Sequence, residues 1–122
     1  MTNSVLELNL NALEANFPQL TATLRSIDLT GFQAEMVHTK TSAPSLRIIS
    51  PESGKPELLH SAYDPIREAQ RWAESATFES PINVVVLGIG LGYHLLTLVK
   101  LHQRLLRHLI IIEQDPRIMW IA

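Results

Sequence analysis

The chain has 122 residues, of which 46% are hydrophobic and 18% are charged, with a formal net charge of −2 and no cysteine. This length supports one domain with a single core, and the composition is that of a folded globular protein. The near-neutral charge excludes the basic surface typical of nucleic-acid binders, and the lack of cysteine excludes disulfides, thiolate nucleophiles and cysteine zinc sites.

The sequence contains neither a secretion signal nor a membrane-spanning segment. Residues 1–17 lack a basic start and an uninterrupted apolar run. The longest apolar run, residues 82–92, contains three glycines and is too short to cross a bilayer. We therefore expect a cytoplasmic protein that binds neither membranes nor nucleic acid.

Two helices are predicted at the start of the chain. Hydrophobic residues recur at helical spacing over residues 6–17, with Asn3 or Ser4 as candidate caps. Pro18 disfavours helical structure at the preceding residue and is predicted to end or kink this helix. A second short helix is predicted over residues 20–27.

Short strands follow Gly31. Residues 32–39 and 45–50 have the composition of strands, and residues 51–56 supply the chemistry of a turn. Residues 57–60 are a candidate third strand. The pattern does not distinguish a hairpin from a meander.

A clear helix start follows at Asp64-Pro65. Asp64 suits an N-cap, and Pro65 suits the first helical position, where its missing N–H costs nothing. The apolar residues that follow share one predicted helix face: Ile66, Ala69, Trp72, Ala73 and Ala76.

From Ile82 onward, the chain alternates between strand and helix patterns. Residues 82–88 form a hydrophobic run of the kind found in strands buried on both faces, and residues 108–113 form another. A helix is predicted between them, from about residue 92 to about residue 107, and a further helix starts at Asp115-Pro116. The predicted helix would bury, to varying extents, Leu95, Leu98, Val99, Leu101 and Leu106.

This order predicts an α/β fold. Residues 61–122 are expected to form a partial Rossmann-like βαβ unit with parallel strands. Residues 1–60 are expected to form an N-terminal α+β segment of helices and short strands that packs on this unit.

The glycine-rich turn is the main candidate for a ligand site. Gly88, Gly90 and Gly92 alternate between the predicted strand and helix, where glycine permits positive φ and a close approach of the backbone. The N–H groups at the start of the helix, around Tyr93 and His94, would face a ligand.

An acidic residue at the end of the following strand often binds ribose hydroxyls, and Glu113 has this position, with Asp115 as its neighbour. We therefore predict a nucleotide-like site formed by Gly88, Gly90, Gly92, Tyr93, His94 and Glu113. In the alternative, the glycines only allow the helix to pack tightly on the strand, and His94 caps its own turn or packs against the sheet.

The turn does not identify the cofactor. The dinucleotide motif requires Gly or Ala where Tyr93 stands, and the phosphate loop requires a lysine that the turn lacks. The spacing is closer to that of methyltransferases that use S-adenosylmethionine, but these usually have an acid at the position of Val86.

Neither a catalytic residue nor a metal site is predicted. The polar residues 60–64 are not a catalytic triad, because Asp64 is better explained as a helix cap. The histidines at positions 38, 102 and 108 lack the spacing of metal ligands. Trp72 and Trp120 are most simply core or interface residues.

Several motifs taken together carry a family resemblance. They are His-Ser-x-Tyr-Asp-Pro at residues 60–65, Glu68-Ala69, the glycine turn at residues 88–94, and Glu113 with Asp115-Pro116. Over roughly residues 57–121, the chain resembles the N-terminal part of the motility accessory factor family. These bacterial proteins, also described as similar to 6-hydroxymethylpterin diphosphokinases, are implicated in flagellin glycosylation.

The resemblance implies a longer parent protein. In this family, a second Rossmann-like domain follows and is thought to carry the sugar-transfer site. The implied donor is a CMP-activated nonulosonic acid, and the acceptor is Ser or Thr of flagellin. The chain would then be an accessory domain without catalysis of its own, partnered by the C-terminal domains of a glycosyltransferase and by flagellin, with a nucleotide or nucleotide-sugar as the parent's ligand.

Two alternatives remain open: a methyltransferase-like domain that binds S-adenosylmethionine, and a non-catalytic interaction module. The final predicted helix is marginal without tertiary packing, and a parallel sheet needs both faces covered. We therefore expect a piece of a longer protein that, by itself, forms a two-fold dimer through an apolar patch around Met119 and Trp120.

Overall fold

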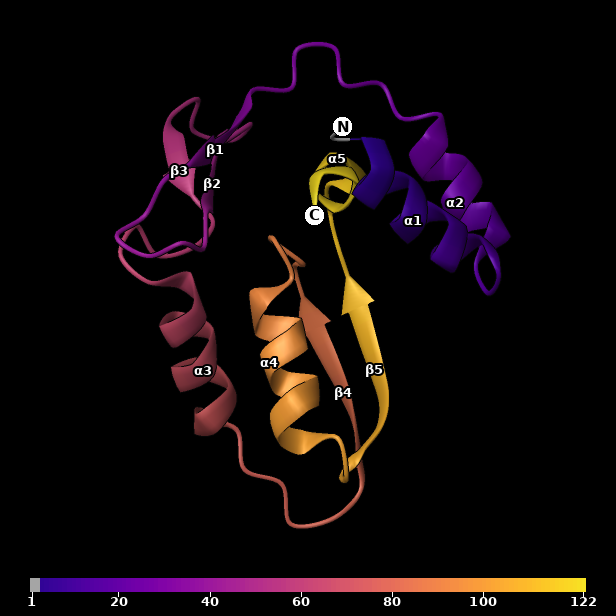
Figure 1. The fold of residues 1–122 in the computed structure, drawn as a ribbon, viewed down its shortest axis with the longest axis vertical. Helices are drawn as coiled ribbons and strands as arrows, with labels where there is room; N and C mark the ends of the chain where they lie inside the picture. The colour runs from indigo at the N-terminus through magenta and orange to yellow at the C-terminus, as the bar shows by residue number, and fades with distance from the viewer. Residues whose placement is uncertain (1–2) are drawn as a thin grey trace.

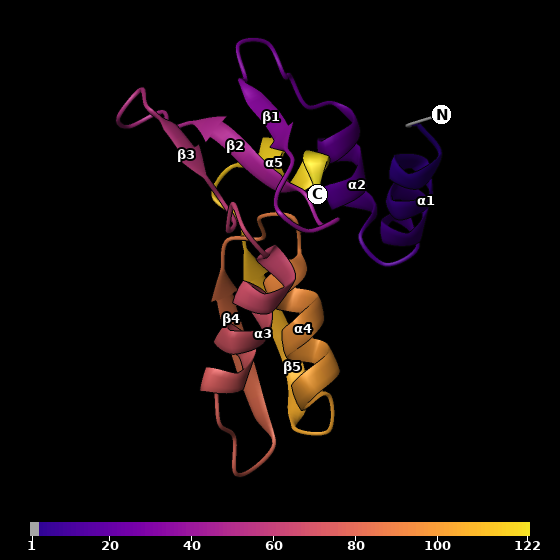
Figure 2. The same ribbon diagram turned by 60° about the vertical axis from the view of Figure 1, so that its left-hand side comes forward.

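The computed structural model describes residues 3–122, and within them the fold is mixed α/β, as predicted. An antiparallel sheet has the strand order β1-β2-β3, and a parallel sheet consists of β4 and β5. Figures 1 and 2 show the antiparallel sheet, α1, α2 and α5 in the upper part of the molecule and the parallel sheet with α3 and α4 in the lower part. In chain order, the elements are α1 (Asn3–Glu14), α2 (Pro18–Arg25), β1 (Ala34–Val37), β2 (Ser45–Ile49), β3 (Pro56–Leu58), α3 (Pro65–Ser75), β4 (Ile82–Leu87), α4 (Tyr93–His102), β5 (Leu106–Ile112) and α5 (Pro116–Ile121).

The predicted break between the first two helices is confirmed. Helix α1 ends at Glu14, and Pro18 occupies the first turn of α2. The two helices are joined by an ion pair in which Arg25 lies 3.0 Å from Glu7. The side chains of Asn3 and Ser4, the candidate caps, lie outside the described residues.

The N-terminal strands form a meander, since β2 pairs antiparallel with both β1 and β3. Strand β3 is shorter than predicted and begins one residue earlier, at Pro56. Leu46 and Ile48 of β2 are buried against Ile118 of α5. This packing explains how a helix of less than two turns is stable here.

The packing of α5 corrects the predicted surface patch. Met119 and Trp120 are half-buried, and neither is among the exposed large hydrophobic residues. The sequence showed their apolar character but did not show that β2 lies beside the helix.

Strands β4 and β5 are parallel and connected through α4, which confirms the predicted βαβ unit. With two strands, the sheet does not by itself establish a Rossmann-type fold. Helix α4 ends at His102, five residues earlier than predicted, because the residues that follow it begin to pair with β4. The N–H of Ile82 donates to the carbonyl of Leu105 at 2.8 Å, and Leu106 is the first residue of β5.

One face of the parallel sheet is packed and the other is exposed. Helix α3 packs beside α4, and Ala73, Val86, Leu95 and Leu98 form the core of this region. Within the described residues, the second face of these strands is therefore uncovered, although their hydrophobic runs are typical of strands buried on both faces. Of the residues predicted to be buried by α4, Val99 and Leu101 are exposed.

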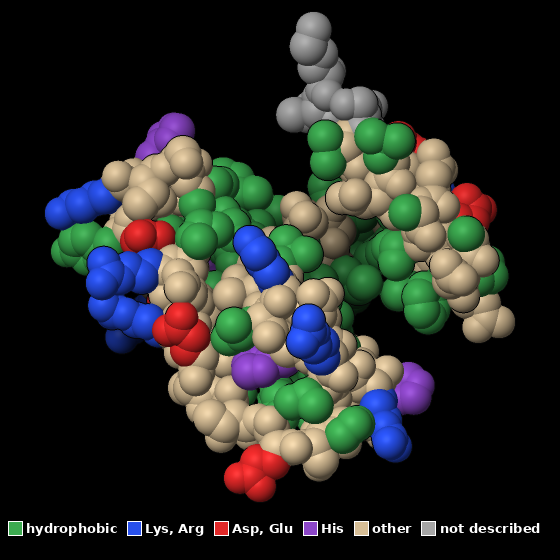
Figure 3. Space-filling model, turned by 60° about the horizontal axis from the view of Figure 1, so that its bottom comes forward, with side chains coloured by type: hydrophobic (Ala, Val, Ile, Leu, Met, Phe, Trp, Pro, Cys, Tyr) green, Lys and Arg blue, Asp and Glu red, His purple; other side chains and the backbone are tan. Residues whose placement is uncertain are grey.

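The exposed face, called the outer sheet face below, carries four aliphatic side chains on adjacent strands. They are Val85 and Leu87 of β4 and their register partners Ile110 and Ile112 of β5, each at least 50% exposed. Seen from the lower end, the molecule also has a hollow beneath α1 and α2, with hydrophobic side chains at its back (Figure 3). Among the described residues, none of the helices could span a lipid bilayer.

Candidate functional site

The glycine turn connects β4 to α4 at the carboxyl end of the parallel sheet. Gly88, Gly90 and Gly92 have φ values of 87°, 52° and 82°, which confirms the predicted need for positive φ. The N–H of Gly88 donates to the carbonyl of Ile112 at 2.7 Å, so the turn starts as a continuation of the strand pairing.

His60 makes the close approach to this turn. The backbone N–H of Leu91 donates to His60 Nε2 at 2.8 Å. A Cβ atom placed on Gly90 would lie 2.5 Å from the same nitrogen. Gly90 is therefore required because a side chain of the same chain lies against it. The carbonyl of His60 in turn accepts a hydrogen bond from Ser45 Oγ at 2.8 Å, which anchors this segment to β2.

Glu113 contacts the turn from the other side. Its Oε2 accepts from the N–H of Ile89 at 2.9 Å, and its Oε1 accepts from the N–H of Asp115 at 2.8 Å. Both carboxylate oxygens are thus already bonded to backbone N–H groups. The contact between Glu113 and a ribose stays a prediction. A ribose hydroxyl would have to donate to a carboxylate oxygen that already accepts a backbone N–H.

Tyr93 and His94 both contact His60, but their other partners differ. The hydroxyl of Tyr93 donates to the carbonyl of Pro44 at 2.8 Å, and burial raises the pKa of this phenol. The imidazole of His94 stacks on that of His60, with 5.5 Å between ring centroids, and meets Trp72 edge-on at 5.1 Å. Tyr93 thus links α4 to the segment before β2, and its ring also meets His60 edge-on, with 5.0 Å between the ring centroids. Both residues therefore contact His60.

A cavity of about 420 Å³ lies beside the turn. Gly88, Gly90, His94 and Glu113 line it, whereas Gly92 and Tyr93 do not. His60 and Trp72, which were not predicted as site residues, also line it. The cavity therefore brings together most of the predicted ligand-binding residues.

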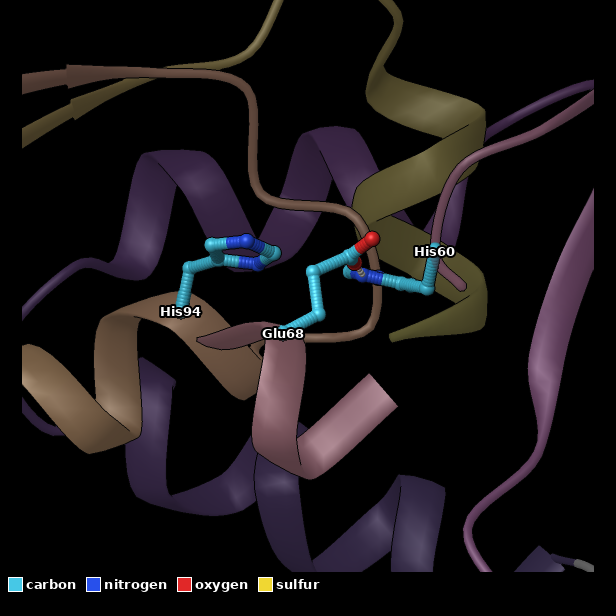
Figure 4. Close-up of side chains that lie close together, drawn as sticks. All are labelled: His60, Glu68 and His94. Atoms are coloured by element: carbon cyan, nitrogen blue, oxygen red, sulfur yellow. Dashed lines mark ion pairs between the residues drawn. The ribbon is translucent and has the colours of Figure 1, made fainter. Parts of the chain in front are cut away.

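A second feature of the site is a cluster of His60, Glu68 and His94. The three side chains come from the segment before α3, from α3 and from the start of α4 (Figure 4). One candidate ligand atom from each lies within 4.8 Å of those of the other two. His60 Nδ1 is 3.8 Å from Glu68 Oε1, is buried, and has no hydrogen-bond partner.

The sequence predicted no metal site, and His60 and Glu68 were absent from the predicted site. Their spacing along the chain is not that of a local metal motif, since His94 joins them only through the packing of α4 beside α3. The available signal was the family resemblance, whose motifs include His60, Glu68 and His94.

The surroundings of His60 predict a pH dependence of stability. Burial lowers the pKa of His60, the nearby His94 lowers it further, and the carboxylate of Glu68 acts in the opposite direction. The unfolded chain therefore takes up this proton first as the pH falls. Stability should be fully present above the ordinary histidine pKa of about 6.5 and should decline as the pH falls below it.

We expect this decline to be steeper in the natural chain than in a His60→Gln variant, whose side chain does not titrate. Urea unfolding at a series of pH values between about 7.5 and 5.5, above the range of most carboxylates, measures the difference. Parallel curves for the two chains would show that His60 does not contribute.

Comparison with known proteins identifies one family. A family model described as the glycosyltransferase Maf N-terminal domain matches residues 33–122. This range contains all elements from β1 to α5, including the turn, its two acceptors and the cavity. Searches of curated proteins and of solved structures found no significant match.

Proposed function

Since the chain belongs to the glycosyltransferase Maf N-terminal domain family, we propose that it is the accessory N-terminal domain of a larger Maf-like protein. In this proposal, the larger protein transfers a nonulosonic acid from a CMP-activated donor to Ser or Thr of flagellin. The support for the donor and acceptor is the resemblance to the motility accessory factors. The chain itself supplies a docking surface.

This proposal rests on the exposure of the outer sheet face. Parallel sheets are normally covered on both faces, and monomeric proteins seldom leave large apolar patches open. Leu87, at the end of β4, is 79% exposed. We propose that the C-terminal domains of the parent protein cover this face.

The two parts of the chain act as one unit in this proposal. Residues 1–60 supply β2, against which Ile118 packs, and Pro44, to which Tyr93 is bonded. The N-terminal α+β segment would therefore fix the orientation of the βαβ unit relative to the domains that follow.

The bonding of the turn favours a structural role. His60 and Glu113 already accept the N–H groups of Leu91 and Ile89. These are groups that a bound phosphate or ribose would otherwise engage.

A nucleoside site is the second candidate function, because the cavity is lined by Trp72 and by Gly88, Gly90 and Glu113. Aromatic and glycine backbone surfaces suit a base and a ribose. Calorimetric detection of CMP or S-adenosylmethionine binding, weakened by Glu113→Gln, would favour this candidate over a purely structural turn.

We expect deletion of the parent gene to lower the mass of flagellin by its nonulosonic acid residues, and the natural gene to restore that mass. Restoration should fail with Val85→Lys, because burying an ammonium group in the docked face is costly and Val85 does not line the cavity. Mass spectrometry of intact flagellin measures both effects.

The matched control is Leu96→Lys, at a leucine of α4 that is 72% exposed but lies outside the outer sheet face. It should restore the flagellin mass. An unchanged mass after gene deletion would refute the proposed acceptor, and full restoration by Val85→Lys would refute the proposed docking surface.

A further inference from the structure

We propose that His60, Glu68 and His94 bind a divalent transition-metal ion such as Zn²⁺, and that this binding releases the backbone N–H of Leu91 from His60. The proposal rests on the geometry of the cluster, on the chemistry of its three donors and on the unpartnered nitrogen of His60. It does not depend on the parent protein's activity.

The three donors already lie close to the positions that a metal requires. In a tetrahedral zinc site with bonds of about 2.0–2.1 Å, two ligand atoms are about 3.3 Å apart. Here His60 Nδ1 and Glu68 Oε1 are 3.8 Å apart, and one candidate ligand atom from each of the three residues lies within 4.8 Å of those of the other two. Figure 4 shows Glu68 between the two imidazoles, with its carboxylate toward His60.

Small side-chain movements would complete the site. The side chain of Glu68 is 41% exposed and can rotate, whereas that of His60 is almost fully buried and fixed. Glu68 Oε1 also accepts from the N–H of Ser61 at 3.1 Å, which holds the carboxylate near the start of α3. The site is thus built around a rigid His60, with Glu68 as the adjustable ligand.

The donor types select the class of metal. Two imidazoles and one carboxylate suit zinc and related transition metals, whereas magnesium and calcium prefer oxygen ligands throughout. The carboxylate supplies a negative charge beside two imidazoles that bind metal in their neutral form. His60 Nδ1 is a buried polar atom without a partner, and such atoms in folded proteins call for an explanation.

Metal binding and the bond to Leu91 compete for the same imidazole. A neutral imidazole has one N–H and one nitrogen that can accept. Because His60 Nε2 accepts from Leu91, the proton of the neutral ring is on Nδ1. For Nδ1 to bind a metal, this proton must move to Nε2, which can then no longer accept from Leu91.

The turn can accommodate that loss. Leu91 lies between Gly90 and Gly92, so its peptide groups can reorient more easily than in most chains. Metal binding exchanges three metal–water bonds for three bonds to protein donors and breaks the hydrogen bond from Leu91 to His60. Release of the waters and pairing of the metal with the Glu68 carboxylate favour the metal-bound form. Because His60 and His94 also line the cavity, a fourth ligand such as water has room on that side.

We expect one equivalent of Zn²⁺ to bind the 122-residue chain with micromolar or tighter affinity, in calorimetry at a pH above the ordinary histidine pKa. His94→Ala and Glu68→Gln should each weaken binding at least about tenfold. Glu68→Gln keeps an oxygen that can accept from Ser61. His60→Ala is avoided because His60 holds the turn.

The matched control is His108→Ala, at an exposed histidine bonded to Asn83, which should bind zinc as the natural chain does. Thermal unfolding without metal checks that each variant is folded. No saturable binding at millimolar zinc, or binding that His94→Ala and Glu68→Gln leave unchanged, would overturn the metal site.

NMR tests the release of Leu91. Zinc should shift the Leu91 amide proton and speed its exchange with solvent, while Ile89, bonded to Glu113, keeps its protection. Binding at the three residues with an unchanged Leu91 amide would overturn the competition between the two bonds.

Discussion

Gly90→Ala should destabilise the protein by about 3 kcal/mol, because two costs coincide at this position. A residue with a Cβ in the left-handed region costs about 1–2 kcal/mol, and φ at Gly90 is 52°. The new Cβ would also lie 2.5 Å from His60 Nε2 and displace the imidazole from the N–H of Leu91. Loss of that bond leaves the partly buried N–H of Leu91 without its partner, which adds up to about 1–3 kcal/mol.

Gly88→Ala is the matched control. Its φ is 87°, but nothing lies within 4 Å of the position of a new Cβ. Only the backbone cost of about 1–2 kcal/mol applies there. The difference between the variants therefore isolates the contact with His60.

Thermal unfolding measures the effect. With a shift of about 4 °C or more per kcal/mol in a small domain, Gly90→Ala should lower the Tm by roughly 10 °C or more. Gly88→Ala should lower it by about half as much. Equal Tm shifts would mean that the His60 side chain moves aside at no cost in stability, and the turn would then not depend on this contact.

Local features of the fold were predictable from the sequence because their causes are local. Asp64 accepts from the N–H of Arg67 at 2.9 Å, and Asp115 accepts from the N–H of Arg117 at 3.0 Å. Both are N-caps followed by a proline, as expected from the residue order. The parallel pairing of β4 and β5 was equally predictable, since a helix connects two apolar runs.

Features that depend on distant contacts were not predictable from local pattern. The positive φ of Gly90 follows from the turn. The approach of His60 to the turn does not, because His60 and its bonded partner Leu91 are 31 positions apart in the sequence. Glu113 was predicted at the correct edge of the sheet, whereas its bonds to backbone N–H groups depend on how the turn lies. An apolar strand also gives no indication of whether its second face is covered.

The exposure of that second face predicts self-association of the isolated chain. Contact between two outer sheet faces would remove aliphatic side chains from water at about 25 cal/mol per Å² of apolar surface. Val85 and Leu87 of one chain would meet the same face of its partner, as in a two-fold dimer. We expect concentration-dependent dimers in light scattering and sedimentation experiments.

Leu87→Lys should raise the dimer Kd by roughly 100-fold or more, because a lysine within the contact must be desolvated without a partner. Leu96→Lys makes the same substitution at a leucine of similar exposure on α4, and it should leave the dimer Kd unchanged. Trp120→Asp should act differently from both. Since Trp120 is half-buried on α5, that substitution should lower the Tm.

These three variants separate the outer sheet face from α5 as the contact. If Trp120→Asp dissociated the dimer at an unchanged Tm while Leu87→Lys did not, α5 would be the contact surface despite its burial. A monomer at every concentration would mean that four exposed aliphatic side chains are too small a surface to hold two chains together. The outer sheet face would then need the larger area of a different partner to be covered, because stable interfaces usually bury more than about 1,000 Å².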